Sequence, residues 1–390
     1  MFDFDNVIDR RGTDCNKWDG GWGQPPVPSD EYSFTIADMD FPCPPCVSDV
    51  ISKRAAHPIY GYTHPGEGLA EAVIGWMQRR HGAELKKEWI MNSTGILTGL
   101  SFALRAAAQA GDRVMVFTPV YNPFFTIIEG AGCIVDECQL INTGSRYEID
   151  WEACEAHFAS GIKAVMFCNP HNPVGRVWSR EELERLAELC DRYNVWFLSD
   201  EAHADFALFG NKYTPISALK SFDRLGISCI SSNKSFNTAG VSIAFVIIKD
   251  PEVKDKASRL QRGVWITQPT LFSMAAAEAG YAGADEWMDE VCSYIGANVS
   301  FVSGYIRQRM PKIKVTEPEG TFLMWLDISC FGMKDIDVIN ELKGYGVRLS
   351  PGKVYRGDGA KHIRFNIAAP RSLLEAALDK VASMYEKYCR

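Results

Sequence analysis

The sequence lacks several features that would place it in a well-marked class. It contains no run of about 18 apolar residues, so no membrane-spanning helix is expected. Its 41 basic residues stand against 49 acidic ones, and a net charge of −8 argues against a general nucleic-acid binder. The acidic stretch Met1 to Asp5 lacks the basic start and apolar core of a signal peptide. We therefore expect a cytoplasmic protein that binds neither membranes nor nucleic acids.

Metal-binding and nucleotide-binding motifs are also scarce. Of the 12 cysteines, Cys43 and Cys46 form a Cys-x-x-Cys pair, but no second pair and no histidine pair stand at zinc-ligand spacing. We interpret these two residues as incidental thiols of a proline-stiffened loop, and we expect no metal site and no disulfide framework. The small-residue turn at Ser93 to Leu97 lacks the glycine spacing of a P-loop or a dinucleotide fingerprint, which argues against ATP and NAD.

What the chain does contain is a globular composition and an alternation of strand and helix patterns. With 46% hydrophobic and 23% charged residues, its 390 residues suit about two domains. The stretch Ser179 to Tyr193 predicts an amphipathic helix, with Ser179 and Glu182 as a capping box. Short apolar runs predict strands at residues 114–117, 164–168, 195–198, 227–231 and 244–248. This alternation predicts an α/β fold with a mostly parallel sheet covered on both faces.

The two ends of the chain have a different character. Strands are expected at 312–316 and 322–327 and near Val347 and Ile363, and helices near 335–343 and from Ser372 onward. This pattern predicts a smaller α+β domain. The first 55 residues are rich in proline, aspartate and aromatic residues, which is typical of an arm. We therefore expect an N-terminal arm at 1–55 that packs with the small domain, a large domain at 56–284 and a small C-terminal domain at 285–390.

Polar groups follow three of the predicted strands. Asn172 lies in the run Asn-Pro-His-Asn-Pro-Val-Gly, Asp200 in Ser-Asp-Glu, and Lys234 in Ser-Ser-Asn-Lys. Side chains at the carboxyl ends of parallel strands point into the crevice where α/β sheets bind ligands. Each group also has an ordinary interpretation, namely a turn, a helix cap or an exposed loop lysine.

A turn of small residues, Ser93 to Leu97, opens a predicted helix that runs to about Ala110. Its backbone N–H groups and the positive end of the helix dipole suit a phosphate, although an ordinary helix cap fits equally well. Enzymes that use pyridoxal 5′-phosphate (PLP) need a phosphate site of this kind. They also need a lysine, an acid for the pyridine nitrogen, a flat side chain against the ring and an anchor for the substrate carboxylate.

In combination, these segments resemble fold type I of the PLP enzymes, the aspartate aminotransferase superfamily. Within it, nearly the whole chain is similar to the MalY/PatB branch of cystathionine β-lyase-like carbon–sulfur lyases. The motifs that carry the resemblance are Lys17-Trp18-Asp19, Ala37-Asp38-Met39-Asp40-Phe41, Tyr60-Gly61-Tyr62-Thr63, Ser199-Asp200-Glu201-x-His203-Ala204-Asp205 and Arg364-Phe365-Asn366-Ile367-Ala368.

The resemblance implies a role for each site residue. Lys234 would be the Schiff-base lysine and proton shuttle, Asp200 would pair with the pyridine nitrogen, and Arg364 would bind the substrate carboxylate in a two-pronged ion pair. The other residues expected at the cofactor are Tyr121 against the ring, Asn172 and His203 near its hydroxyl, and Gly95, Ile96 and Ser231 at the phosphate. Tyr62 would reach the phosphate of the neighbouring subunit, so we expect a homodimer with shared active sites.

The implied activity is α,β-elimination of cystathionine, cysteine or a related S-substituted cysteine to pyruvate, ammonia and a thiol. The same residues serve transamination of a small amino acid, so that alternative stays open, as does a cofactor-bound regulatory protein with vestigial catalysis. The chain departs from the pattern at Ser242, where many aminotransferases have a phosphate-binding arginine. The segment Ser350 to Arg356, expected near the site entrance, is more basic than its usual counterpart.

Overall fold

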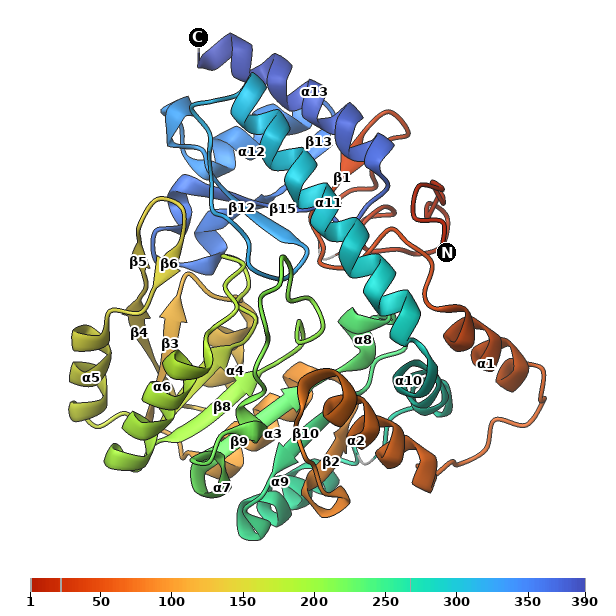
Figure 1. Cartoon of the computed structure of the whole chain (residues 1–390), viewed down its shortest axis with the longest axis vertical. Coiled ribbons are helices and arrows are strands. Elements are labelled where there is room, and N and C mark those ends of the chain that lie inside the picture. The colour runs from red at the N-terminus through yellow and green to blue at the C-terminus, as the bar shows by residue number, and fades with distance from the viewer. Residues whose placement is uncertain (1, 22, 267, 390) are drawn as a thin grey trace.

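A computed structural model describes residues 2–21, 23–266 and 268–389 of the chain (Figure 1). In this part of the chain, seven strands form a central sheet in the order β2-β10-β9-β8-β7-β3-β4. Their bounds are β2 Ile90–Ser93, β3 Arg113–Thr118, β4 Ile134–Gln139, β7 Ala164–Cys168, β8 Trp196–Asp200, β9 Gly226–Ile230 and β10 Ala244–Ile248. All neighbouring pairs from β9 to β4 are parallel, whereas β10 is antiparallel to both β2 and β9. The predicted α/β fold with a mostly parallel sheet is confirmed.

Helices cover both faces of this sheet because its strands are apolar on both sides. Val116 and Met166 belong to an apolar cluster with α3 (Ile96–Ala107), α4 (Pro123–Gly130) and α9 (Pro251–Gly263). Their chain neighbours Phe117 and Phe167 belong to a second cluster on the other face. The helices that join this second cluster are α2 (Glu67–His81), α5 (Trp151–Ala159), α6 (Arg180–Tyr193), α7 (Phe222–Leu225) and α10 (Leu271–Gly283). Helix α6 begins at the predicted capping box of Ser179 and Glu182.

The C-terminal part forms a separate antiparallel sheet. Its strand order is β11 (Lys314–Val315), β12 (Leu323–Asp327), β15 (His362–Asn366) and β14 (Ser350–Pro351). Three helices accompany this sheet: α11 (Asp285–Arg309), α12 (Asp335–Gly344) and α13 (Arg371–Tyr388). Helix α12 packs against β14 and β15, and α13 packs against both α11 and α12. In Figure 1 the long helix α11 runs diagonally between the region of the central sheet and the second sheet.

The first 55 residues have two kinds of contact. Strand β1 (Tyr32–Ser33) pairs in parallel with β13 (Val347–Arg348) from the C-terminal part. Helix α1 (Pro45–Ala55) instead packs against α10. One continuous apolar cluster also includes core residues of both sheets, such as Phe117 and Trp325. The division into an arm and two domains therefore stays a prediction.

The described residues also bear on the features that the sequence lacks. None of their helices is both long and apolar enough to cross a membrane. Cys43 and Cys46 are free thiols at the start of α1, and burial raises the pKa of each. Such thiols are less reactive than an ordinary cysteine, because the thiolate is the reactive form. Within the same described ranges, no group of three or more potential ligands could hold a metal ion.

Candidate active site

The candidate site lies where three neighbouring parallel strands end. Asp200 is the last residue of β8, and Asn172 lies in the loop that follows β7. Lys234 lies in the short helix α8 (Ser232–Ser235), directly after β9. Figure 1 shows α8 between the central sheet and the lower end of α11. The three polar groups that the sequence places after strands therefore share one edge of the sheet.

Lys234 contacts the N-terminal segment from within the site. Its Nζ donates a hydrogen bond to the carbonyl oxygen of Ala37, which lies between β1 and α1. Burial lowers the pKa of Lys234 to about 8, while the charges of Asp38 and Asp200 act in the opposite direction. A lysine with this pKa has much more neutral amine near neutral pH than an ordinary one, as a nucleophile or a general base requires.

Asp200 is a buried acid with one hydrogen bond from the described residues. The residue is 3% exposed, and its Oδ1 accepts from the N–H of Ala202 at 3.0 Å. Its partners in register on the two adjacent strands are Cys168 and Cys229, both buried. Burial raises the pKa of Asp200 to about 7. A positively charged ring N–H beside this carboxyl would therefore gain a strong partner, because the carboxylate is poorly solvated.

Arg364 faces this edge from β15. Its Nη2 donates to the carbonyl oxygen of Thr35 at 2.6 Å, and its Nη1 donates to Oδ1 of Asn172 at 3.2 Å. The guanidinium carbon lies 5.3 Å from the ring centroid of Tyr355. Its Nε is buried and has no hydrogen-bond partner among the described residues. A buried arginine with a free donor suits an anionic ligand such as a carboxylate.

Two aromatic residues predicted at the cofactor are neutral in this setting. Burial lowers the pKa of His203 far below its ordinary value, and the charges of Lys234 and Arg364 act in the same direction. Its Nδ1 is buried without a partner in the described part of the chain. Burial together with Asp200 raises the pKa of Tyr121, which lies just after β3. Both side chains thus present uncharged rings, which suits contact with an aromatic ligand.

The expected phosphate end is built from the starts of α3 and α8. Gly95 is the N-cap and Ile96 the first residue of α3, so N–H groups of the first helical turn are available there. A Cβ atom at Gly95 would come within 3.0 Å of Oγ of Ser242, so this approach is close. Oγ of Ser242 accepts from Nδ2 of Asn233 at 2.8 Å and donates to no described residue. Oγ of Ser231, in contrast, already donates to the carbonyl oxygen of Ile243 at 2.7 Å.

Two predicted features lie away from this group of residues. The side chain of Tyr62 is fully exposed, on the segment 56–66 that loops out at the right of Figure 1. Arg356, part of the basic segment, donates to Oε1 of Glu137 at 2.9 Å, and its guanidinium carbon lies 3.8 Å from the ring centroid of Phe125. Its charge is therefore paired on the outer side of α4 and β4. Ser350, from the same segment, does approach Arg364, with Oγ 3.4 Å from Nη2.

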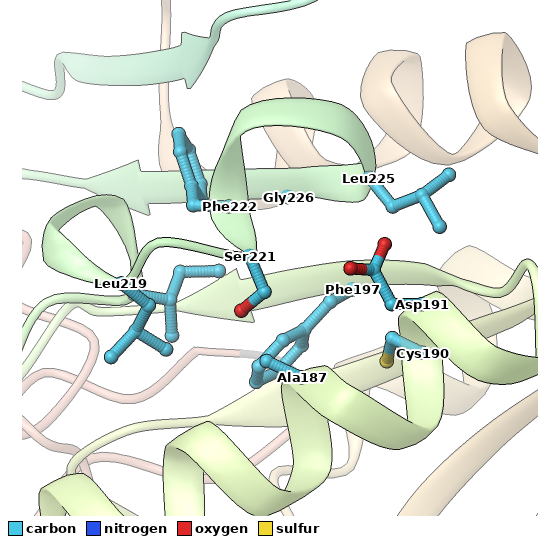
Figure 2. Close-up of a pocket in the computed structure, with 10 residues that line it drawn as sticks. Ala187, Cys190, Asp191, Phe197, Leu219, Ser221, Phe222, Leu225 and Gly226 are labelled. Atoms are coloured by element: carbon cyan, nitrogen blue, oxygen red, sulfur yellow. The ribbon is translucent and has the colours of Figure 1, made fainter.

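A separate small pocket lies near the opposite ends of the strands (Figure 2). Phe197, near the start of β8, and Gly226, at the start of β9, line it together with Cys190 of α6 and Leu225 of α7. Its volume of 10 Å³ gives room for about one water molecule. We interpret it as a packing gap between helices and sheet, since the polar groups described above lie at the other edge.

Comparison with known proteins agrees with this geometry. The family model for aminotransferase class I and II matches residues 30–381. The chain belongs to this family. It is 35% identical to cystathionine beta-lyase PatB of Bacillus subtilis, over 97% of this chain and 98% of that protein. It is 29% identical to protein MalY of Escherichia coli, over 96% of both chains. The resemblance to the MalY/PatB branch is confirmed.

Solved structures give the same result for the fold. A PLP-bound putative aminotransferase from Clostridium difficile superposes with a TM-score of 0.94 at 32% identity, covering 99% of this chain and 100% of that one. Cystalysin from Treponema denticola, whose crystal structure contains a PLP cofactor, also gives 0.94, at 28% identity and 99% coverage of both chains. The fold type I architecture expected from the motifs is therefore confirmed over 99% of the chain.

The structure also brings residues to the site that the sequence did not indicate. The carbonyl oxygens of Thr35 and Ala37 accept from the two cationic side chains, Arg364 and Lys234. Ser242 lies beside Gly95, although the sequence analysis treats it only as a missing arginine. The sequence offers a signal for Ala37 alone, because the Ala37 to Phe41 motif carries the resemblance without having a role assigned to it, whereas Thr35 lies outside that motif.

Proposed function

We propose that this chain is a PLP-dependent carbon–sulfur β-lyase that acts on cystathionine, cysteine or a related S-substituted cysteine. The observation that carries the proposal is the grouping of Asp200 and Lys234 at one edge of the central sheet, with Arg364 facing them from β15 of the other sheet. Burial raises the pKa of the acid and lowers the pKa of the lysine. The choice of β-lyase is supported by the 35% identity with a cystathionine β-lyase over 97% of this chain.

The residues present fit PLP. Nδ1 of His203 and Nε of Arg364 are buried and have no hydrogen-bond partner among the described residues, and the carboxylate of Asp200 accepts one hydrogen bond there. Polar groups of a ligand would supply the missing hydrogen bonds. We assign Asp200 to the ring nitrogen, Lys234 to the aldehyde carbon, and Tyr121, Asn172 and His203 to the ring and its hydroxyl. We assign Gly95, Ile96 and Ser231 to the phosphate, and we assign Ser242 as the hydroxyl donor, because the hydroxyl of Ser231 already donates to Ile243. When bound, PLP supplies an electron sink for charge that develops on the substrate α-carbon.

The side chains of this chain then have distinct tasks. Arg364 binds the substrate carboxylate and so fixes which substituent of the α-carbon faces Lys234. The neutral amine of Lys234 takes the α-proton at Nζ, which its lowered pKa of about 8 favours. Asp200 holds the proton at the ring nitrogen, and the sulfur substituent leaves from the β-carbon as a thiolate.

The second candidate is an aminotransferase of a small amino acid. The similarity to a putative aminotransferase structure at 32% identity favours it. Proton removal by Lys234 begins both reactions, so the residues described do not separate them. A regulatory protein with vestigial catalysis is a weaker third candidate, because Lys234, Asp200 and Arg364 are all present.

A product assay separates the three candidates. The full chain loaded with PLP is given cystathionine, with and without a panel of keto acids, and pyruvate, ammonia and thiol are quantified. The proposal predicts pyruvate, ammonia and thiol in equal amounts without any keto acid, and no products from Lys234→Ala. Amino-group transfer that requires a keto acid would establish the aminotransferase instead, and no turnover of either kind would favour the regulatory protein.

We further propose a homodimer whose active sites are shared through Tyr62. Tyr62, Ile59, Tyr60 and Trp265 are all exposed in the single chain, as apolar residues of a subunit interface would be. A hydroxyl bonded to a charged phosphate contributes about 1.5–3 kcal/mol, so Tyr62→Phe should weaken PLP binding by about ten- to a hundredfold. A cytoplasmic location stays a prediction.

Mixed dimers test the sharing directly. Subunits with Tyr62→Phe are combined with subunits carrying Lys234→Ala, and activity is measured at limiting PLP. A shared site gives one hybrid site with both defects and one with neither, so activity up to about half of the wild-type value should return. If Tyr62 serves its own subunit, every hybrid site carries one defect and no activity returns.

A further inference from the structure

We propose that Asp38 is a positioning residue that sets the charge of the Lys234 amine from the N-terminal side of the site. Its carboxylate is held in place by Arg10 and Lys17. This inference rests on the proposed function for the role of Lys234, and it adds to that function a part played by the first 41 residues.

The backbone around Asp38 is fixed from two directions by asparagine side chains. Nδ2 of Asn366 donates to the carbonyl oxygens of Ile36 at 2.6 Å and Asp38 at 2.7 Å. On the other side, Asn237 accepts from the N–H of Met39 at 3.0 Å and donates to the carbonyl oxygens of Met39 and Phe41. Asn237 lies three residues after Lys234 and Asn366 two residues after Arg364. The segment is therefore tied to β15, which carries Arg364, and to the turn just after α8, which carries Lys234.

The side chain of Asp38 belongs to a cluster of four charges. Nη2 of Arg10 lies 2.6 Å from Oδ2 of Asp38, and Nζ of Lys17 lies 3.4 Å from Oδ1. The same two cations contact Asp40, at 2.6 Å and 2.7 Å. Lys17 is 2% exposed, so this cluster is poorly screened by solvent. Two cations balance two carboxylates, and loss of Asp38 would leave an excess positive charge beside the site.

The charges of the cluster reach Lys234. Lys17 and Arg10 hold the pKa of Asp38 below its ordinary value, although burial acts against them, so its carboxylate is ionised at neutral pH. Among the groups that oppose the burial of Lys234, Asp38 has the largest effect. The charged and titratable groups that face Lys234 are Asp38 and Lys17 from the N-terminal segment, Asp200 from β8, His203 after β8 and Arg364 from β15.

Removing the carboxylate should therefore make Lys234 neutral at a lower pH. An opposite charge at close range shifts a pKa by about 1–3 units, and we expect about one for Asp38→Asn. The main measurement is a pH titration of the yellow absorbance band of the full chain loaded with PLP, which follows the proton on the Lys234 nitrogen. The midpoint should fall by about one pH unit in Asp38→Asn and stay within about 0.3 of wild type in Asp38→Glu, which keeps the charge.

A matched control separates this effect from a general change of charge. Asp9→Asn removes the same charge from an exposed carboxylate of the same segment, paired with Arg11 at 3.1 Å, and should leave the midpoint unchanged. An unchanged midpoint in a folded Asp38→Asn variant would overturn the proposal. Lys17→Gln covers the case in which that variant does not fold, because Lys17 is the cation of the cluster whose charge acts on Lys234. Loss of this cation should raise the midpoint, and a midpoint that stays or falls would overturn the proposal equally.

The role of Asp38 can be tested even if the proposed function is wrong. If the full chain forms no yellow band, Lys234 does not carry PLP, and the proposed function fails. Competitive acetylation of the full chain without PLP, over a range of pH, still gives the titration midpoint of Lys234 from the peptide that contains it. Asp38→Asn should lower that midpoint by about one pH unit as well, and equal midpoints in the two proteins would contradict the role of Asp38.

Discussion

The two halves of the candidate site are built in different ways. Asn172, Asp200 and Lys234 each follow a strand of one parallel sheet, so the sheet alone brings them together. The other half joins the two ends of the chain, because Arg364 donates to the carbonyl oxygen of Thr35, 329 positions away. Burial shifts the pKa values of Asp200 and Lys234, whereas the carboxylate of Asp38 is held ionised by cations. The sheet half thus has reactive groups whose pKa values are shifted towards neutral pH, and the other half supplies fixed charges and backbone acceptors.

The largest effect is expected in the sheet half. Asp200→Asn should lower kcat by about 10²–10⁴, because an uncharged amide does not hold a proton on the ring nitrogen. The change is measured as the rate of pyruvate release at saturating cystathionine. Glu201→Gln is the matched control, since Glu201 instead accepts from Ser228 at 2.5 Å and from the N–H of Ile216 at 3.0 Å. Near-normal kcat in Asp200→Asn would remove Asp200 from the mechanism.

The second effect concerns the stability of the full chain without PLP. Between about pH 4 and 7, the folded chain keeps a proton on Asp200 that the unfolded chain has lost, because burial raises the pKa of Asp200 to about 7. Raising the pH through this window therefore destabilises the folded chain, by about 2–4 kcal/mol. Denaturant unfolding should find Asp200→Asn more stable than wild type above pH 7, with the difference vanishing near pH 4. A difference that does not change with pH would contradict the buried-acid description.

A smaller effect is expected in the half that joins the two chain ends. Arg364→Lys keeps the charge but loses the guanidinium fork, so KM should rise by about ten- to a hundredfold while the cofactor spectrum stays unchanged. Arg348→Lys is a suitable control, because Arg348 forms an ion pair with Glu31, with 2.7 Å between Nε of Arg348 and Oε2 of Glu31, and has no assigned role at Lys234. An unchanged KM would place the substrate carboxylate elsewhere.

This contrast also explains what the sequence could predict. Apolar runs and a capping box predict the strands and α6, and from them follows the shared edge of Asn172, Asp200 and Lys234. Backbone carbonyls such as that of Ala37 have no residue-type signature, so their contact with Lys234 could not be predicted. The hydroxyl of Ser231 donates its hydrogen bond to the carbonyl oxygen of Ile243, which no residue pattern indicates. The short distance between Ser242 and Gly95 depends on how two loops pack. The exposed Tyr62 has no structural explanation within one chain, since its predicted role lies in another subunit.

Lys234 is where the two halves meet, and the account depends on its bond to the cofactor. Borohydride reduction of the full chain loaded with PLP, followed by peptide mapping, measures which lysine carries the label. The account predicts one labelled site, Lys234, with loss of that label in Lys234→Ala. A label on Lys17 or any other lysine, or retention of the label in Lys234→Ala, would contradict it.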